Sequence, residues 1–321
     1  MARILAIGGA HIDRKGWLAA SHRAGVSNPG CWETEAGGGA FNAARNLARL
    51  GHQVTLVAPR GGDAAADLVA RAAEDAGIED CPLTFLDRTT PSYSAILEPD
   101  GNLVTALADM ALYDLVPARR LLTSRLRKRL ASAELLLVDS NLPESALSAL
   151  ADAAAVLGLP LAVIAVSPAK VVRWRSSLSK ITVLAMNAAE AAALSGLQAS
   201  TQSEWPALLA RTGLSGGLVS DGAGPVTAFA AGQAITSLPP VLDRLIDVIG
   251  AGDALASGYL DGLLSGGSLE ANLTRGIALA RLTAGVLGPV RPDLSPALLA
   301  QALARMPKPD ESQIPVQEHQ T

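Results

Sequence analysis

Short apolar runs alternate along the chain with longer segments in which apolar residues recur every three or four positions. The runs cover Ile4 to Ile7, Gln53 to Val57, Glu134 to Val138, Leu161 to Val166, Ile181 to Leu184 and Gly217 to Ser220. Apolar runs of this length predict buried strands. Strands that alternate with helices are typical of a mainly parallel sheet, so we expect an α/β fold.

The longer segments predict helices, three of which end directly before a glycine. They are Ala40 to Leu50 before Gly51, Ala64 to Ala76 before Gly77, and Glu144 to Leu157 before Gly158. Glycine just past a helix is a C-terminal capping signal. Further helices are predicted over Ala251 to Leu264, Leu269 to Val286 and Pro296 to Arg305. Residues 306–321 are polar and contain proline, so we expect a disordered tail there.

Two segments break this alternation. Residues Trp17 to Ala36 are rich in glycine, serine and proline, and Ser92 to Leu107 alternates apolar and polar residues around Asp100-Gly101, which is a hairpin signal. We expect a small β-lid, from about residues 12–36 and 88–110, over the strand ends where open α/β sheets bind ligands. A surface hairpin without a function is the alternative.

Composition narrows the class of protein. The chain of 321 residues is 49% apolar and only 3% aromatic, which suits helices packed on a buried sheet in one domain over residues 1–305. With a formal net charge of −4 we expect no nucleic-acid partner. No apolar run is long enough for a membrane span. Cys31 and Cys81 lack metal-ligand spacing, so we expect a cytoplasmic protein.

The most informative stretch for chemistry is Asp247-Val248-Ile249-Gly250-Ala251-Gly252-Asp253, directly before a predicted apolar helix. Amides at a helix start are unpaired and lie at the positive end of the helix dipole, so a glycine-rich entrance can receive a phosphoryl group. Asp253 would lie beside that group and could accept a proton from an attacking hydroxyl. The alternative is that Asp253 only caps the helix.

Two further glycine segments come early in the chain. Gly37-Gly38-Gly39 precedes a helix that carries Asn42, and Gly8-Gly9 leaves the first strand and leads to His11 and Asp13. A carboxylate after the first strand commonly holds the vicinal hydroxyls of a ribose. His11 is interpreted as a substrate contact or as a packed histidine.

Two more segments suit the phosphates of a nucleotide. Asn187 and Glu190 follow a predicted strand, and oxygen ligands at that spacing suit a hydrated Mg²⁺. The same two residues also fit a capping box. The turn Ser220-Asp221-Gly222-Ala223-Gly224 comes between two apolar runs and could hold a nucleotide.

In their order and spacing, these segments resemble the ribokinase-like (PfkB) family of sugar and nucleoside kinases over about residues 3–305. The resemblance implies a three-layer α/β/α fold with a β-lid, ATP and Mg²⁺ as cofactors, and phosphate transfer to a primary hydroxyl. It makes Asp253 the catalytic aspartate, with Gly250, Ala251 and Gly252 as the anion hole.

The resemblance also implies the nucleotide and cation contacts. Asn187 and Glu190 match the family's Asn-x-x-Glu motif near Mg²⁺, and Ser220, Gly222 and Gly224 match its nucleotide-binding turn. Asp247 and the carbonyl of Ile249 lie where many members bind a monovalent cation such as K⁺.

Finer details resemble the pseudouridine kinase branch of the family: Gly9 to Gly16, Asn46 to Gly51, Asp139 to Pro143, and the Asp109-Met110 pair. The implied substrate contacts are His11, Asp13, Lys15, Gly38, Gly39, Asn42, Thr105, Asp109 and Asn141. Of these, Asp13, Gly38 and Asn42 would hold ribose hydroxyls, and Lys15, Thr105 and Asp109 would lie near the base or at the lid closure.

Three positions depart from the family pattern. Val248 replaces the usual threonine, His11 replaces the asparagine of this branch, and the turn from Ser220 to Gly224 is one residue shorter. The expected activity is ATP-dependent phosphorylation of the 5′-hydroxyl of a ribonucleoside, with pseudouridine first. The alternatives are a kinase of another nucleoside or sugar, such as ribose or a 2-keto-3-deoxy acid, and a non-catalytic sensor on a kinase scaffold. Because lid strands expose edges, a homodimer through paired lids is also expected.

Overall fold

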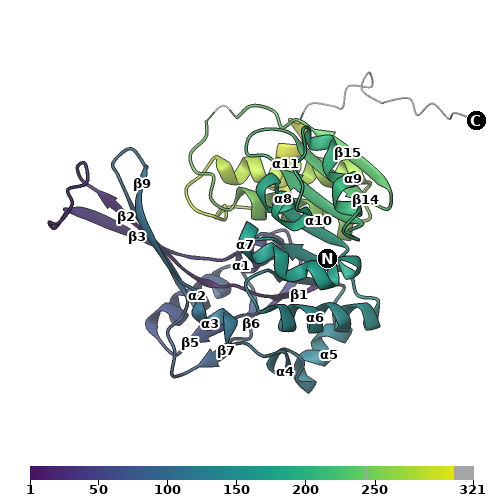
Figure 1. Ribbon diagram of the computed structural model, residues 1–321, viewed down its shortest axis with the longest axis horizontal. Helices are drawn as coiled ribbons and strands as arrows, with labels where there is room; N and C mark the ends of the chain where they lie inside the picture. The colour runs from purple at the N-terminus through teal and green to yellow at the C-terminus, as the bar shows by residue number, and fades with distance from the viewer. Residues whose placement is uncertain (243, 307–321) are drawn as a thin grey trace, which may run out of the picture.

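A computed structural model describes residues 1–242 and 244–306. Its main feature is a sheet of nine strands, shown in Figure 1. In spatial order they are β15 (Gln233–Ser237), β14 (Val226–Ala230), β13 (Gly216–Ser220), β12 (Val183–Asn187), β11 (Leu161–Ile164), β10 (Leu135–Asp139), β1 (Arg3–Ile7), β4 (Gln53–Val57) and β6 (Glu79–Asp80). Strands β13 to β6 run parallel, and β14 and β15 are antiparallel additions at one edge.

Helices cover both faces of this sheet, because successive residues of each strand point to opposite faces. In β1, Ile4 and Ala6 join one apolar core while Leu5 and Ile7 join the other. The first core includes α1 (Gly39–Arg49), α2 (Ala64–Asp75), α10 (Ala251–Leu264) and α11 (Leu269–Ala284), with α12 (Pro296–Ala304) packed outside α10 and α11. The predicted three-layer α/β/α arrangement is confirmed.

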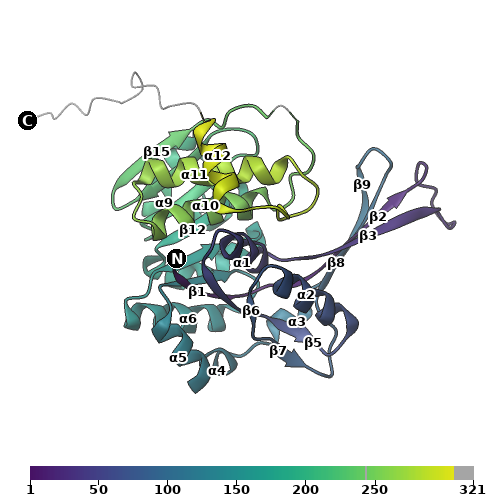
Figure 2. The same cartoon turned by 180° about the vertical axis from the view of Figure 1, so that it is seen from behind.

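The second core lies under the other helical layer, which Figure 2 shows from behind. This layer contains α4 (Ala118–Leu121), α5 (Ser124–Ser132), α6 (Glu144–Leu157), α7 (Pro168–Val171), α8 (Ala188–Ser195), α9 (Trp205–Ala210) and the 3₁₀ segment η1 (Val172–Lys180). The remaining elements are α3 (Ala111–Asp114), η2 (Gln202–Glu204) and a pair of short strands, β5 (Pro59–Gly61) and β7 (Leu83–Phe85).

A separate four-stranded sheet forms the lid and projects from the body in both overall views (Figures 1 and 2). Its order is β3 (Gly30–Gly37), β2 (His11–Leu18), β8 (Ser92–Leu97) and β9 (Leu103–Asp109). The hairpin predicted around Asp100-Gly101 is present as β8 and β9. The segment from Trp17 to Ala36, predicted only as part of a lid, supplies the end of β2 and nearly all of β3.

Element ends differ from the sequence prediction in a few places. The run Leu161 to Val166 ends as a strand at Ile164, and Val166 takes a left-handed conformation with φ of 71°. The run Ile181 to Leu184 is wrong by two to three residues, because the strand covers Val183–Asn187. The helix predicted to reach Val286 ends at Ala284. The predicted tail lies outside the described residues from position 307 onward.

The parallel strands place their carboxyl ends at one edge of the sheet, as is general for parallel strands. Gly8 follows β1, Asp139 ends β10, Asn187 ends β12 and Ser220 ends β13. Residues that are far apart in the sequence therefore converge beneath the lid. No helix within the described parts of the chain combines the length and apolar character that crossing a bilayer requires.

Candidate active site

The glycine turn before α10 has a geometry that only glycine tolerates at one position. Gly250 has φ of 75°, and a β-carbon there would lie 2.1 Å from the carbonyl oxygen of Pro289. The Ala251 amide donates to the Val248 carbonyl at 3.2 Å. The amides of Gly250 and Gly252 have no hydrogen-bond partner among residues 1–242 and 244–306. Among the three predicted anion-hole amides, those of Gly250 and Gly252 are thus free within the described residues, while that of Ala251 is used inside the turn.

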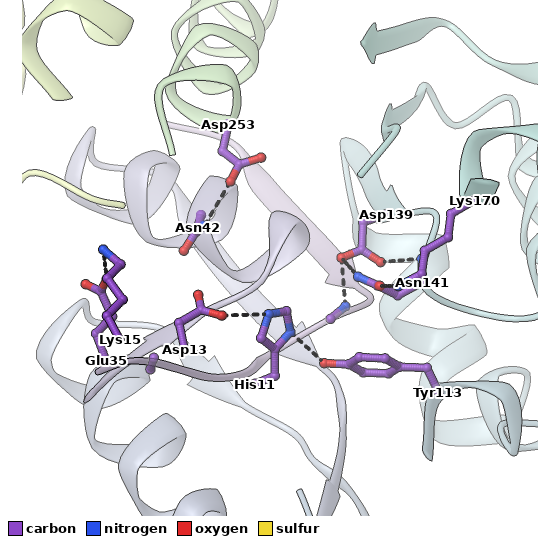
Figure 3. A network of polar contacts seen from close by, with 12 residues as sticks. His11, Asp13, Lys15, Glu35, Asn42, Tyr113, Asp139, Asn141, Lys170 and Asp253 are labelled. Carbon is purple, nitrogen blue, oxygen red and sulfur yellow. Dashed lines mark hydrogen bonds and ion pairs between the residues drawn. The ribbon is translucent and has the colours of Figure 1, made fainter. Parts of the chain in front are cut away.

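The Asp253 side chain points from the start of α10 toward α1, as Figure 3 shows. Asn42 Nδ2 donates to Asp253 Oδ2 at 2.8 Å, and Asn42 Oδ1 accepts from Arg45 Nη2 at 2.7 Å. The Asp253 carboxylate makes no hydrogen bond to the start of its own helix within the described residues. Asp253 is therefore not a helix cap, and Asn42 orients its carboxylate. Because the side-chain NH₂ and the side-chain oxygen of Asn42 both have partners within the protein, they are not both free to bind a ribose.

The surroundings of Asp253 change its protonation. Burial raises the pKa of Asp253 to about 7; the Asn42 hydrogen bond opposes this shift, and the charges of Asp139 and Glu190 add to it. A carboxyl group with a pKa near neutrality can both take up and release a proton at physiological pH.

Asp139, at the end of β10, ties the two early glycine loops together. This fully buried carboxylate accepts hydrogen bonds from the amides of Gly9 at 2.8 Å and Ala40 at 3.0 Å. Gly38 has φ of 116°, and a β-carbon there would lie 2.5 Å from the Gly9 carbonyl oxygen. Gly39 is the first residue of α1. The loops are packed so closely that larger residues are excluded at Gly38.

Asn141 and Lys170 extend this cluster, and the sequence reasoning missed both Asp139 and Lys170 as site residues. Asn141 donates to Asp139 through its amide at 3.0 Å and its side chain at 2.8 Å, and its Oδ1 accepts from Lys170 Nζ at 2.6 Å. Burial lowers the pKa of Lys170, while the Asp139 charge opposes that shift. The available signal was that both residues follow apolar strands at the carboxyl edge of the sheet.

The lid strand β2 supplies Asp13, His11 and Lys15. His11 Nε2 lies 3.4 Å from Asp13 Oδ1. The other carboxylate oxygen lies against Gly37, where a β-carbon would approach Asp13 Oδ2 to 2.0 Å. The structure therefore brings Asp13 and His11 together beside the Gly37 to Gly39 loop, as the substrate assignment requires.

Lys15 lies between the lid and the turn before α10. Its Nζ is 3.2 Å from Glu35 Oε1 and 3.5 Å from Asp247 Oδ2. Burial lowers the pKa of Lys15, but the two carboxylates outweigh burial and the pKa is raised. Asp247 also accepts from the amides of Ile249 at 3.0 Å and Gly288 at 3.3 Å. Because an ammonium and two amides already contact this carboxylate, Asp247 does not fit the predicted role of K⁺ ligand.

Thr105 and Asp109 are not brought together with the other substrate candidates. Directly paired residues of neighbouring strands place their side chains on the same face of a sheet. Thr105 pairs with Ile96, which pairs with Gly16, and Asp109 connects through Ser92 to Ile12. Asp13 and Lys15 alternate with Ile12 and Gly16 along β2, so Thr105 and Asp109 lie on the opposite face of the lid.

The residues assigned to the nucleotide meet at the ends of β12 and β13, where Asn187 pairs with Ser220. Asn187 and Glu190 form a complete capping box, so the structural alternative for this motif is present. Burial raises the pKa of Glu190, opposed by its hydrogen bond from the Asn187 amide. The turn after Ser220 is tight: Gly222 has φ of 54° and the Gly224 amide donates to Asp221 at 2.7 Å.

Glu190 fits a metal that arrives with a nucleotide better than a metal bound by protein alone. The described residues contain no group of three or more His, Cys, Asp or Glu side chains that could hold a metal ion. Glu190 uses Oε2 for the capping box, which leaves Oε1 to face a hydrated Mg²⁺ carried by phosphates.

Comparison with known proteins identifies the arrangement. The family model described as pfkB family carbohydrate kinase matches residues 1–295. The pseudouridine kinase of Escherichia coli (strain K12) is 31% identical over 269 residues, which cover 81% of this chain and 84% of the relative.

Solved structures give the same picture. A carbohydrate kinase from Agrobacterium tumefaciens is 48% identical, with a TM-score of 0.88 over 96% of this chain and 99% of that protein. Arabidopsis thaliana ribokinase complexed with ribose and ATP is 20% identical, with a TM-score of 0.82 over 94% and 98% of the two chains. The second match shows the ribokinase-like fold alone.

The raised pKa of Asp253 predicts how turnover depends on pH. If this carboxylate must be ionised to accept a proton, kcat/KM will fall below about pH 7, by about ten-fold per pH unit. The measurement is a pH profile of kcat/KM with the acceptor substrate held below KM. A profile that stays flat down to pH 5 would contradict this role.

Stability provides an independent control on the same group. Its pKa is higher in the folded state than the ordinary value of 3.8, so folding favours the protonated form. The stabilisation is complete below pH 3.8 and is lost as pH rises through 7. Above pH 7, Asp253→Asn is expected to raise the free energy of unfolding relative to the wild type, and the difference shrinks on acidification.

The contacts of Lys15 predict that this protein does not need K⁺. Replacing K⁺ by tetramethylammonium, which is too large for such a site, is expected to change turnover by less than about two-fold at constant ionic strength. Lys15→Met removes the internal ammonium and should make both turnover and the melting temperature respond to K⁺. A wild-type enzyme that is inactive without K⁺ would show that the Lys15 ammonium does not replace K⁺ at Asp247.

Proposed function

We propose that this chain, which belongs to the pfkB family of carbohydrate kinases, transfers the terminal phosphate of ATP to the 5′-hydroxyl of a ribonucleoside, with pseudouridine as the preferred acceptor. Members of the family are phosphotransferases that act on hydroxyl groups, and this chain is one of them. The substrate and the roles of individual residues are the proposed part.

One observation carries the proposal: the Asp253 carboxylate lies at the start of α10, next to two free amides, and accepts a hydrogen bond from Asn42 of α1. An acceptor hydroxyl at Asp253 would thus face a phosphoryl group bound at Gly250 and Gly252. Positive helix ends and unpaired amides stabilise the charge on a transferring phosphoryl group.

In the proposed reaction, Asp253 accepts the proton of the 5′-hydroxyl as the oxygen attacks the γ-phosphorus. The new oxygen to phosphorus bond forms while the bond to the β-phosphate oxygen breaks, and ADP leaves with that electron pair. Mg²⁺, when bound with ATP, neutralises phosphate charge, and Glu190 is the residue placed to face it. Lys170 Nζ, which donates a hydrogen bond to Asn141 at the same edge of the sheet, adds a second positive charge besides that of Mg²⁺.

The acceptor side supports a ribose. Asp13 and the Gly37 to Gly39 loop lie on the lid side of α1, and a carboxylate with neighbouring backbone amides suits two vicinal hydroxyls. The identity of 31% to the E. coli pseudouridine kinase makes pseudouridine the first acceptor to test. His11 and Val248, which depart from the family pattern, are the reason to keep another nucleoside or sugar as the second candidate.

The first test is ATP consumption with pseudouridine, uridine, ribose and adenosine. We expect the highest kcat/KM with pseudouridine, and a loss of about 10²-fold or more in Asp253→Asn, which keeps shape and hydrogen bonding but cannot accept the proton. Binding of pseudouridine without turnover would favour the sensor hypothesis. Turnover of ribose above all nucleosides would move the substrate to the free sugars.

The lid supports a proposal about assembly. Its outer face, opposite Asp13, carries Trp32 and Leu107, which are 53% and 70% exposed, and Ile96 packs beside Trp32 over Gly16. Strands β3 and β9 are the free edges of this sheet. Exposed apolar faces and free strand edges are features of interfaces, so two lids are proposed to pair in a homodimer.

Sedimentation velocity tests this assembly. The wild type is expected to sediment as a dimer, and Leu107→Arg should shift it to the monomer because a charge would be buried in the interface. Val156→Arg is the matched control, since Val156 is 86% exposed and lies on α6 in the body. A monomeric wild type, or a dimer that Leu107→Arg leaves intact, would contradict pairing through the lids.

A further inference from the structure

A buried tyrosine lies at the end of a chain of polar contacts that leads to Asp13. Tyr113 belongs to the short helix α3 and is 1% exposed. Its Oη lies 3.0 Å from His11 Nδ1, and His11 Nε2 lies 3.4 Å from Asp13 Oδ1. The two rings meet at an interplanar angle of 66°. Figure 3 shows the three side chains in a row, with His11 between Tyr113 and Asp13.

The chemistry of Tyr113 decides the direction of its hydrogen bond with His11. Burial raises the pKa of Tyr113 well above its ordinary value, the Asp139 charge adds to the shift, and a hydrogen bond from the Ala10 amide opposes it. The phenol therefore keeps its proton. It can therefore donate that proton to His11 Nδ1, the nitrogen that lies 3.0 Å from its oxygen.

This donation fixes the tautomer of His11. A neutral imidazole carries one proton, so a ring that accepts at Nδ1 donates at Nε2. The donating nitrogen is the one that faces Asp13 Oδ1. Gly38 also limits the ring, because a β-carbon at that position would lie 3.1 Å from His11 Nδ1. His11 is thus held in one orientation by contacts on two sides.

Asp13 is constrained from both sides in turn. His11 contacts Oδ1, and Oδ2 lies over Gly37, where there is no room for a side chain. An asparagine at position 11 is shorter than histidine and does not span the same distance from a phenol to a carboxylate. The histidine and the buried tyrosine therefore work as a pair in this chain.

We infer that Tyr113 is a positioning residue that acts through His11 to hold the Asp13 carboxylate in the orientation that receives the hydroxyls of the acceptor. The inference rests on the proposed function, because it assigns Asp13 to the acceptor. Tyr113 does not itself contact the acceptor. It acts through His11 on Asp13 alone, so its effect is confined to recognition of the acceptor. The nucleotide side and the proton acceptor Asp253 are not involved.

Tyr113→Phe is the direct test, since it removes one hydroxyl and keeps the buried ring. With pseudouridine and ATP, KM for pseudouridine is expected to rise about five-fold, the effect of losing one buried hydrogen bond. We expect kcat and KM for ATP to stay within about two-fold of the wild type, because the phosphoryl side is untouched. Tyr259→Phe is the matched control: Tyr259 is also 1% exposed but lies on α10.

A double-mutant cycle separates positioning from general packing. Glutamine at position 11 can place its side-chain NH₂ where Nε2 lies, and this donor needs no tautomer to be set. The Tyr113→Phe substitution should therefore raise KM in the wild-type background but not in His11→Gln. Equal effects in both backgrounds would overturn the inference and leave a packing role for the tyrosine.

Calorimetric binding of pseudouridine distinguishes this failure from failure of the proposed function. If the wild type binds pseudouridine but does not phosphorylate it, the same comparison is made on Kd, with the same expected five-fold change. If Tyr113→Phe matches the wild type in Kd and KM, the inference is wrong and the kinase proposal stands. If pseudouridine, uridine, ribose and adenosine all fail to bind, the proposed function fails and this inference with it.

Discussion

The site depends on one constraint: a carboxylate must stay close to other carboxylates, partly out of water, at the positive end of a helix. Asp253 meets this constraint because the side chain of Asn42, on α1, donates a hydrogen bond of 2.8 Å to its carboxylate. The same surroundings raise the pKa of Asp253 to about 7. This pKa suits proton transfer, since a base with such a pKa can accept a proton and later release it near neutral pH.

The acceptor side is built on another carboxylate, Asp139, which is fully buried. Asp139 is satisfied by the amides of Gly9, Ala40 and Asn141, so it holds two glycine loops and the Asn141 side chain in one rigid unit. Buried charges are tolerated when they are fully hydrogen-bonded. The lid then brings Asp13 to this unit on β2, while Lys15 on the same strand contacts Asp247 beside the turn before α10. The acceptor and phosphoryl sides are thereby joined through one strand.

Local patterns predicted the elements but not the contacts between them. Both ends of the helices Glu144–Leu157 and Ala251–Leu264 were predicted correctly. A proline or glycine precedes each helix, and apolar residues recur at helical spacing along its whole length. The strand at Val183–Asn187 was misplaced because the apolar residue Ile181 precedes it. The Ile181 amide still donates to the Leu178 carbonyl and closes the 3₁₀ segment. Two hydrogen bonds at the site, His11–Tyr113 and Asn42–Asp253, join residues 102 and 211 positions apart. No local period encodes such pairs, so Asp13, Asn42 and Asp253 could be predicted as candidates but their partners could not. Tyr113, Asp139 and Lys170, which contact His11, the glycine loops and Asn141, were recognised only in the structure.

The central claim is that Asp253 is a carboxylate whose protonation is set by its surroundings. The most direct measurement is its titration by carbon-13 NMR of the labelled side-chain carboxyl, assigned by comparison with Asp253→Asn. The expected midpoint lies near pH 7 and moves upward in Asn42→Ala, because the hydrogen bond to the ionised form is lost. A midpoint near pH 4, unaffected by Asn42→Ala, would contradict it.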